Sequence, residues 1–110
     1  MENTTSNKKP GFGDLLNGDT PLLVDFFATW CGPCKMLEPA VKQVAQKMAG
    51  KIKVIKIDID KNPNVANLYQ VQGVPTLILF QNGKILWRTS GVMPAYQIEK
   101  LIENIISSSL

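Results

Sequence analysis

Two cysteines separated by two residues give this chain its clearest chemical signal. Cys31 and Cys34 are its only cysteines, and they lie in the segment Trp30-Cys31-Gly32-Pro33-Cys34. A thiolate attacks a disulfide sulfur, so a pair at this spacing can take a disulfide from another molecule and carry it as an internal bond. Such a bond closes so short a loop that it stabilises a fold little. We therefore interpret the pair as reactive.

Other uses of the same spacing stay open. A CxxC pair can be half of a zinc site, but zinc needs four ligands and the chain has no histidine and no third cysteine, so only a site shared by two chains would supply them. An inert buried pair is a further alternative. The absence of histidine also excludes Ser-His-Asp and Cys-His hydrolases. No glycine-rich dinucleotide fingerprint is present, so we expect no bound cofactor.

The cysteines are predicted to lie where a strand ends and a helix begins. Residues 22–28 are apolar on both alternating faces, which is typical of a strand buried on both sides. From residue 33 to about 49, apolar residues recur at helical spacing. The positive end of that helix would favour a thiolate on an exposed Cys31, which predicts that Cys31 is the nucleophile. Cys34, one turn further along, would attack the mixed disulfide.

Three further residues have side chains that could affect the chemistry of the cysteine pair. Pro33 would stiffen the first helical turn at no cost in hydrogen bonds. Asp25 lies within the apolar strand on the same face as Phe27, where burial would raise the pKa of its carboxyl group. We interpret Asp25 as a proton carrier. The alternative is an acid whose surroundings contain more water than the pattern implies. The pattern around Lys56 indicates only a solvated lysine.

The remaining pattern predicts an α/β fold with one mixed sheet. The strand at 53–59 follows the helix, so it should run parallel to the first strand. Asn82-Gly83 separates two apolar runs and predicts a two-residue hairpin. The other predicted elements are short helices at 12–17 and 64–69, hairpin strands at 76–80 and 84–87, and a final helix from about residue 94.

Length and composition predict a single domain. The chain has 110 residues, 45% of them apolar, which suffices for one core. We expect a flexible polar tail at 1–11 and one domain at 12–110. The net charge of +3 is scattered, which argues against nucleic-acid binding. The first ten residues lack the apolar stretch of a secretory signal and no run could span a membrane, so we expect a soluble, cytoplasmic protein. We also expect it to be a monomer.

The segment from Val24 to Lys35 (VDFFATWCGPCK), followed by Val74-Pro75-Thr76 and Asn82-Gly83, resembles the thioredoxin family. The resemblance runs from about residue 21 to 110. It implies the thioredoxin fold, an α/β fold with a central mixed sheet flanked by helices. The family's first edge strand has no clear counterpart in residues 1–20, so we expect that strand to be missing or altered.

The resemblance also implies a role for each site residue. Cys31 would attack and a buried Cys34 would resolve, while Asp25 would transfer protons to and from Cys34 and Lys56 would tune Asp25. Pro33 would tune the redox behaviour of the pair, and Pro75 would follow a cis peptide bond that sets the Val74 backbone beside the cysteines. The implied docking surface for client proteins consists of Trp30, Gly32, Pro33, Val74, Gly91 and Val92.

The function implied is that of a protein-disulfide reductase. Its dithiol would be restored by thioredoxin reductase, a separate protein that uses NADPH and flavin, and its partners would be disulfide-containing client proteins. Two alternatives remain. The same chemistry in reverse would make it a disulfide oxidant or isomerase, which Gly32-Pro33 disfavours. A binding module could also use the apolar face around Trp30 without any redox step.

Overall fold

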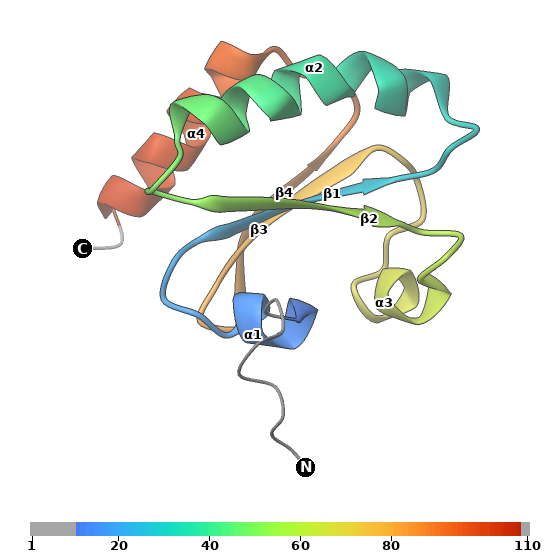
Figure 1. Ribbon diagram of the computed structural model, residues 1–110, viewed down its shortest axis with the longest axis horizontal. Helices are drawn as coiled ribbons and strands as arrows, with labels where there is room; N and C mark the ends of the chain where they lie inside the picture. Colours follow the sequence, from blue (N-terminus) through green and yellow to red (C-terminus); the bar gives the residue numbers. More distant parts are fainter. Residues whose placement is uncertain (1–10, 109–110) are drawn as a thin grey trace.

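The computed structural model describes residues 11–108, and its centre is one mixed β-sheet (Figure 1). The four strands lie in the order β2–β1–β3–β4. β1 runs parallel to β2 and antiparallel to β3, and β4 is antiparallel to β3. The bounds are Leu22–Phe27 for β1, Lys53–Asp58 for β2, Thr76–Gln81 for β3 and Lys84–Ser90 for β4. This confirms the predicted mixed sheet.

Helices cover both faces of the sheet. α2 (Gly32–Lys47) and α4 (Ala95–Ser108) lie on one face, and α1 (Phe12–Leu16) and α3 (Pro63–Leu68) lie on the other (Figure 1). Since β1 is an inner strand, its alternate side chains enter two different cores. Leu22, Val24 and Phe26 pack on the side of α1 and α3, whereas Leu23 packs on the side of α2 and α4. Asp25 shares the face of Leu23, so the strand places a carboxyl group beneath α2.

The hairpin between β3 and β4 forms at Asn82 and Gly83, as predicted. Both residues have positive φ, 53° and 79°, which matches the right-handed twist of the flanking strands. A Cβ atom on Gly83 would lie 2.9 Å from Asn17 Oδ1, so the turn also approaches the end of α1 closely. The Gly83 N–H donates to the Leu16 carbonyl, which ties the hairpin to α1.

The segment before β1, residues 11–20, forms a short helix and no strand. Residues 12–16 form α1, in agreement with the predicted short helix. Within residues 11–108, β2 is therefore an edge strand. Residues 1–10, which make up almost all of the predicted tail, lie outside the described residues. No helix between residues 11 and 108 is long and apolar enough to cross a membrane.

Candidate active site

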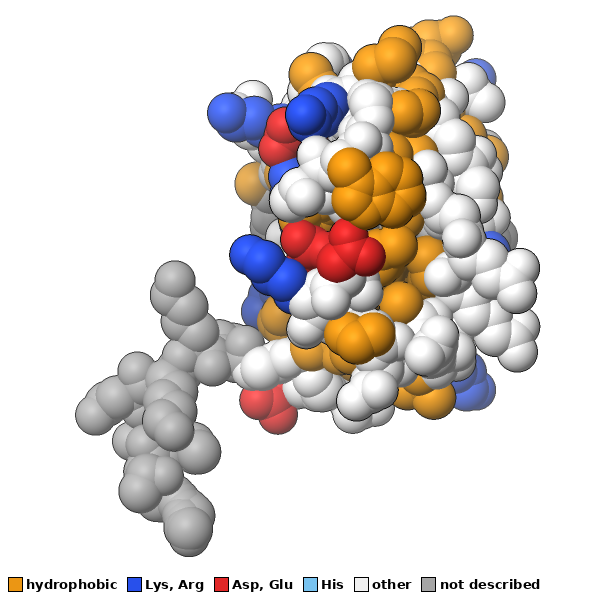
Figure 2. Space-filling model, turned by 90° about the vertical axis from the view of Figure 1, so that its right-hand side faces the viewer, with side chains coloured by type: hydrophobic (Ala, Val, Ile, Leu, Met, Phe, Trp, Pro, Cys, Tyr) orange, Lys and Arg blue, Asp and Glu red, His pale blue; other side chains and the backbone are white. Residues whose placement is uncertain are grey.

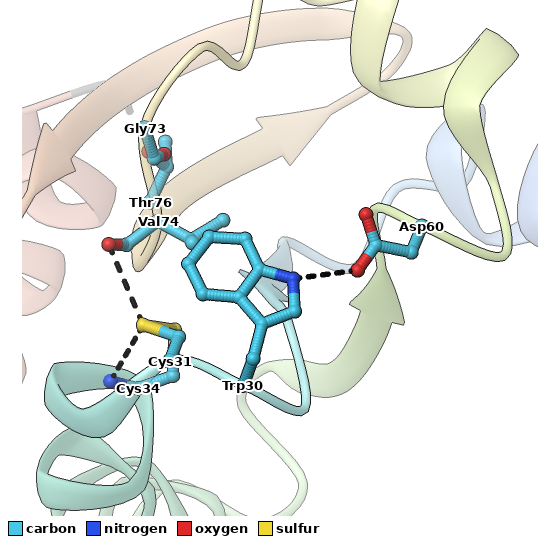
Figure 3. Close-up of a disulfide and its surroundings, with 7 residues drawn as sticks. All are labelled: Trp30, Cys31, Cys34, Asp60, Gly73, Val74 and Thr76. Atoms are coloured by element: carbon cyan, nitrogen blue, oxygen red, sulfur yellow. Dashed lines mark hydrogen bonds between the residues drawn. A yellow bond between two sulfur atoms is a disulfide. The ribbon is translucent and has the colours of Figure 1, made fainter.

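Cys31 is the N-cap residue of α2, and its sulfur is the capping acceptor. The residue is extended, with φ −91° and ψ 111°, and the backbone N–H of Cys34 donates to Cys31 Sγ over 3.1 Å (Figure 3). Pro33 lies in the first turn, where its missing N–H leaves no carbonyl unpaired. The Cys31 sulfur thus lies at the positive end of a 16-residue helix and accepts an amide hydrogen, which favours a thiolate there.

The two sulfurs form a disulfide, and both cysteines are buried. Their Cα atoms are 5.3 Å apart. The exposed fraction is 4% for Cys31 and 5% for Cys34, so the predicted exposure of Cys31 is wrong for this oxidised form. The physical reason is packing, because the pair forms a small core with Ala28 against which Phe27, Ile59 and Val74 lie. Neighbouring groups, rather than exposure, distinguish the two sulfurs.

The loop before β3 lies directly against the disulfide. The Val74–Pro75 peptide bond is cis. Cys31 Sγ lies 3.6 Å from the Val74 carbonyl oxygen (Figure 3). The Thr76 hydroxyl donates to the Gly73 carbonyl over 2.6 Å, and the Gly91 N–H donates to the Pro75 carbonyl over 3.0 Å. These two bonds fix the loop, so the backbone of Val74 has a defined place beside Cys31.

An apolar surface surrounds the disulfide. Trp30 is 69% exposed and Val92 49%, Gly32 and Pro33 are exposed, and Val74 and Gly91 are half-buried. Figure 2 shows the end of the molecule at which β1 ends and α2 begins, where apolar side chains run down the face with acidic side chains beside them. The indole Nε1 of Trp30 donates to Asp60 Oδ2 over 2.8 Å (Figure 3), so this exposed ring is held in one orientation.

Asp25 is the buried acid of the site. It is 1% exposed, and Oδ1 has no hydrogen-bond partner within the described part of the chain. Burial raises the pKa of Asp25 from 3.8 to about 6; the charge of Lys56 opposes this increase and the charge of Glu38 adds to it. Asp25 and Lys56 are register partners on adjacent strands, so their side chains leave the same face of the sheet.

The Lys56 side chain contacts a residue of α2. Its Nζ donates to Glu38 Oε2 and lies 4.7 Å from the centre of the Phe27 ring. A cavity of about 210 Å³ opens beside this pair. Its lining consists of Phe27, Ala28, Thr29, Cys34, Lys35, Glu38 and Lys56. Cys34 therefore lines a cavity that is large enough for water, and a proton can move along such water. Cys31 instead lies against the Val74 carbonyl.

Comparison with known proteins identifies the family. The family model described as Thioredoxin matches residues 3–104. The chain belongs to the thioredoxin family. It is 49% identical over 94 residues to thioredoxin Y2, chloroplastic, of Arabidopsis thaliana, and 45% identical over 88 residues to thioredoxin 1 of Chlorobaculum tepidum. A crystal structure of chloroplastic thioredoxin z superposes with a TM-score of 0.74 at 44% identity, covering 81% of this chain and 80% of that one.

These relatives differ in length. The match to the Arabidopsis thioredoxin covers 84% of this chain but only 56% of that protein, so the chain spans little more than half of its length. The match to the Chlorobaculum thioredoxin covers 79% of this chain and 87% of that protein. The part of this chain that matches the family model, residues 3–104, contains the Cys31–Cys34 disulfide.

Two groups of residues in this thioredoxin site were missed by sequence reasoning. Asp58 Oδ1 accepts from the N–H groups of Asp60 and Lys61, over 2.9 and 3.4 Å, and so fixes the turn that presents Asp60 to Trp30. The signal was an Asp-x-Asp sequence that begins at the last residue of a strand, since aspartate often bonds the backbone two residues on. Glu38 was missed as well, although it lies four residues after Cys34 and so on the same face of α2.

The thioredoxin site has no neighbouring metal centre within residues 11–108. No group of three or more His, Cys, Asp or Glu side chains there could hold a metal ion. The Cys31–Cys34 disulfide is itself a group that can accept and donate electrons.

Proposed function

We propose that this thioredoxin-family chain is a protein-disulfide reductase. The proposal is carried mainly by one observation, the Cys31–Cys34 disulfide at the N-terminus of α2, in which the Cys34 amide donates to the Cys31 sulfur. An amide donor and a helix N-terminus on the same sulfur favour its thiolate, which is the attacking species in thiol–disulfide exchange. The relatives named thioredoxin support the same reaction class.

In the first step, the Cys31 thiolate attacks one sulfur of a client disulfide. The client S–S bond breaks, one client sulfur becomes bonded to Cys31, and the other leaves as a thiolate that takes a proton from solvent. We propose that an extended client segment pairs with the backbone of Val74, whose carbonyl lies beside Cys31 Sγ. The rest of the docking surface would be Trp30, Gly32, Pro33, Gly91 and Val92, with Pro75 fixing the loop.

In the second step, Cys34 attacks the Cys31 sulfur of the mixed disulfide. The bond from Cys31 to the client breaks, the internal disulfide forms, and two electrons have passed to the client. The proton of the Cys34 thiol goes to the Asp25 carboxylate through water in the cavity and then to the departing client thiolate. An Asp25 with a pKa of about 6 is mostly ionised at pH 7, yet it is a stronger base than an ordinary aspartate.

The reductase direction also needs a supply of electrons. We propose that a separate thioredoxin reductase, using NADPH and flavin, returns the Cys31–Cys34 disulfide to the dithiol, since the sequence contains no dinucleotide fingerprint of its own. We further propose that the chain acts as a monomer in the cytoplasm, where dithiols stay reduced. Its relatives include both chloroplastic and bacterial thioredoxins, so fractionation of the native cell would test the compartment.

The proposal is tested by measuring NADPH consumption with a thioredoxin reductase and a disulfide-bonded client such as insulin. We expect turnover with the full chain and none above background with Cys31→Ser. Glu103→Gln, an exposed change on α4 away from the disulfide, is the matched control and should keep the full rate. A Cys31→Ser variant that still reduces the client would refute the proposed chemistry.

A further inference from the structure

Lys56 lies next to Asp25 in the sheet, but its ammonium group is bound elsewhere. The two residues are register partners across β1 and β2. Lys56 Nζ nevertheless donates to Glu38 Oε2 over 2.5 Å and lies over the Phe27 ring, while Asp25 Oδ1 has no hydrogen-bond partner among residues 11–108. A direct lysine–aspartate pair, which strand register alone would favour, is not formed in the described part of the chain.

We propose that Glu38 is a positioning residue for the proton-transfer step, because its carboxylate holds the Lys56 ammonium at the solvent side of the cavity and leaves Asp25 without an ion-pair partner. The inference rests on the proposed function, in which Asp25 accepts the Cys34 proton. A buried carboxylate that forms a close pair with lysine stays ionised and is a weak base. Without that pair, Asp25 binds a proton more readily, as its role requires.

The other charged groups around Asp25 do not replace Glu38 in this role. On α2, Lys35 and Glu38 line the cavity with Cys34, and Lys42 lies beside Glu38 and Lys56. On β2, Lys56 and Asp58 share the face toward α2, and Asp58 accepts from the backbone N–H groups of Asp60 and Lys61. β3 places the apolar Leu77 opposite Asp25. On α4, Glu99 pairs with Lys47 at the far end of α2, with 3.9 Å between their charged atoms. Among these groups, Glu38 is the acid that contacts Lys56.

Glu38 stays charged while Asp25 titrates. The hydrogen bond from Lys56 holds the pKa of Glu38 below its usual value, so Glu38 is ionised around pH 6, where Asp25 changes charge. Both side chains of the pair are partly exposed, 40% for Lys56 and 55% for Glu38. Water and salt therefore weaken their field, and we expect a moderate effect that decreases as ionic strength rises.

The experiment follows the Asp25 carboxyl carbon by NMR through a pH titration of the disulfide form of the full chain. We expect Glu38→Gln to lower the midpoint by about 0.5 pH unit, because Lys56 is then free to approach Asp25. Gln is a good helix former, so this exposed site on α2 should tolerate it. Glu103→Gln makes the same charge change on α4 and should leave the midpoint unchanged. Equal midpoints for wild type and Glu38→Gln would overturn the proposal.

Repeating the Glu38→Gln change in a Lys56→Gln variant shows whether Glu38 acts by holding Lys56 or by repelling the Asp25 carboxylate directly. Lys56→Gln should raise the Asp25 midpoint, and Glu38→Gln added to it should then shift the midpoint by less than half as much as in the wild type. A shift of equal size in both backgrounds would mean that Glu38 acts without Lys56, contrary to the proposal. The titration involves no client, so failure of the reductase assay would leave this result standing, and the reverse also holds.

Discussion

The Cys34 backbone N–H donates to the Cys31 sulfur over 3.1 Å, so the first cysteine caps the helix that contains the second. This bond makes the two sulfurs unequal, although both residues are equally buried. A negative charge on Cys31 is stabilised by the amide and by the helix end. Within residues 11–108 no such donor contacts the Cys34 sulfur, and Cys34 instead lines the cavity shared with Glu38 and Lys56. This difference supports the proposed order of attack, in which Cys31 acts first and Cys34 second.

Cys34→Ser should trap the client. Cys31 can still attack, but no second thiol releases it, so covalent mixed disulfides accumulate. Non-reducing gel electrophoresis after incubation with an oxidised client should show an adduct that disappears on reduction. Cys31→Ser is the matched control, since its remaining Cys34 is buried and lines the cavity beside Glu38 and Lys56. Adducts that form with Cys31→Ser rather than with Cys34→Ser would reverse the assigned order.

Asp25→Asn should slow release of the client. Asn cannot take the Cys34 proton, and general base catalysis contributes at least about 100-fold where it operates fully. Because water in the cavity can replace part of it, we expect the single-turnover release rate at pH 7 to fall about 10- to 100-fold. Rates measured from pH 6 to pH 8 that match the wild type would remove Asp25 from the mechanism.

Asp25 should also make stability depend on pH. Its pKa is about 6 in the folded state and 3.8 when unperturbed, so between these values the folded state holds a proton that the unfolded state has lost. Wild-type stability therefore falls as pH rises from about 4 to 6, and above pH 6 the full loss of roughly 3 kcal/mol is present. Below pH 3.8 the contribution vanishes, because both states are protonated.

Asp25→Asn removes this dependence. The free energy of unfolding of the variant relative to the wild type should increase by roughly 2.5 kcal/mol between pH 4 and pH 8, as measured by urea denaturation with the disulfide intact. Comparing the two pH values cancels any packing difference between Asp and Asn. The same relative stability at both pH values would show that the Asp25 pKa is not raised in the fold.

Asp60→Ala should weaken docking of protein clients. The Trp30 indole is held by Asp60, and loss of this hydrogen bond frees a ring that forms much of the exposed apolar surface. A loss of about 1 kcal/mol corresponds to a KM for the client that is about fivefold higher. Reduction of a small aromatic disulfide, which needs little surface, should change less than twofold. Asp19→Ala is the control, and equal effects of both variants would exclude a specific role.

Local sequence signals predicted the elements that place the disulfide. The run at 22–28, apolar on both faces, indicated an inner strand. Asn82-Gly83 indicated the turn, and both of its residues adopt positive φ. Cys31 and Pro33 indicated the helix start, since a cap residue and an early proline are local features. The burial of Asp25 was also expected, because strand alternation assigns its face.

Contacts between distant segments were not predictable in the same way. Glu38 is exposed on α2, and helical periodicity does not show which exposed charge will meet Lys56 on a neighbouring strand. Asp60 lies 30 residues after Trp30, so no local pattern joins them. The burial of Cys31 was missed for a similar reason, since the loop that covers it comes from residue 74, more than 40 residues later.

The reduction potential of the Cys31–Cys34 pair distinguishes a disulfide reductase from a disulfide oxidant. It would be measured by equilibrating the full chain with defined ratios of reduced and oxidised dithiothreitol at pH 7 and separating the two forms after alkylation. A protein-disulfide reductase should give a value near that of thioredoxins, about −270 mV. A value near about −120 mV, typical of a strong disulfide oxidant, would contradict the proposed direction of electron flow.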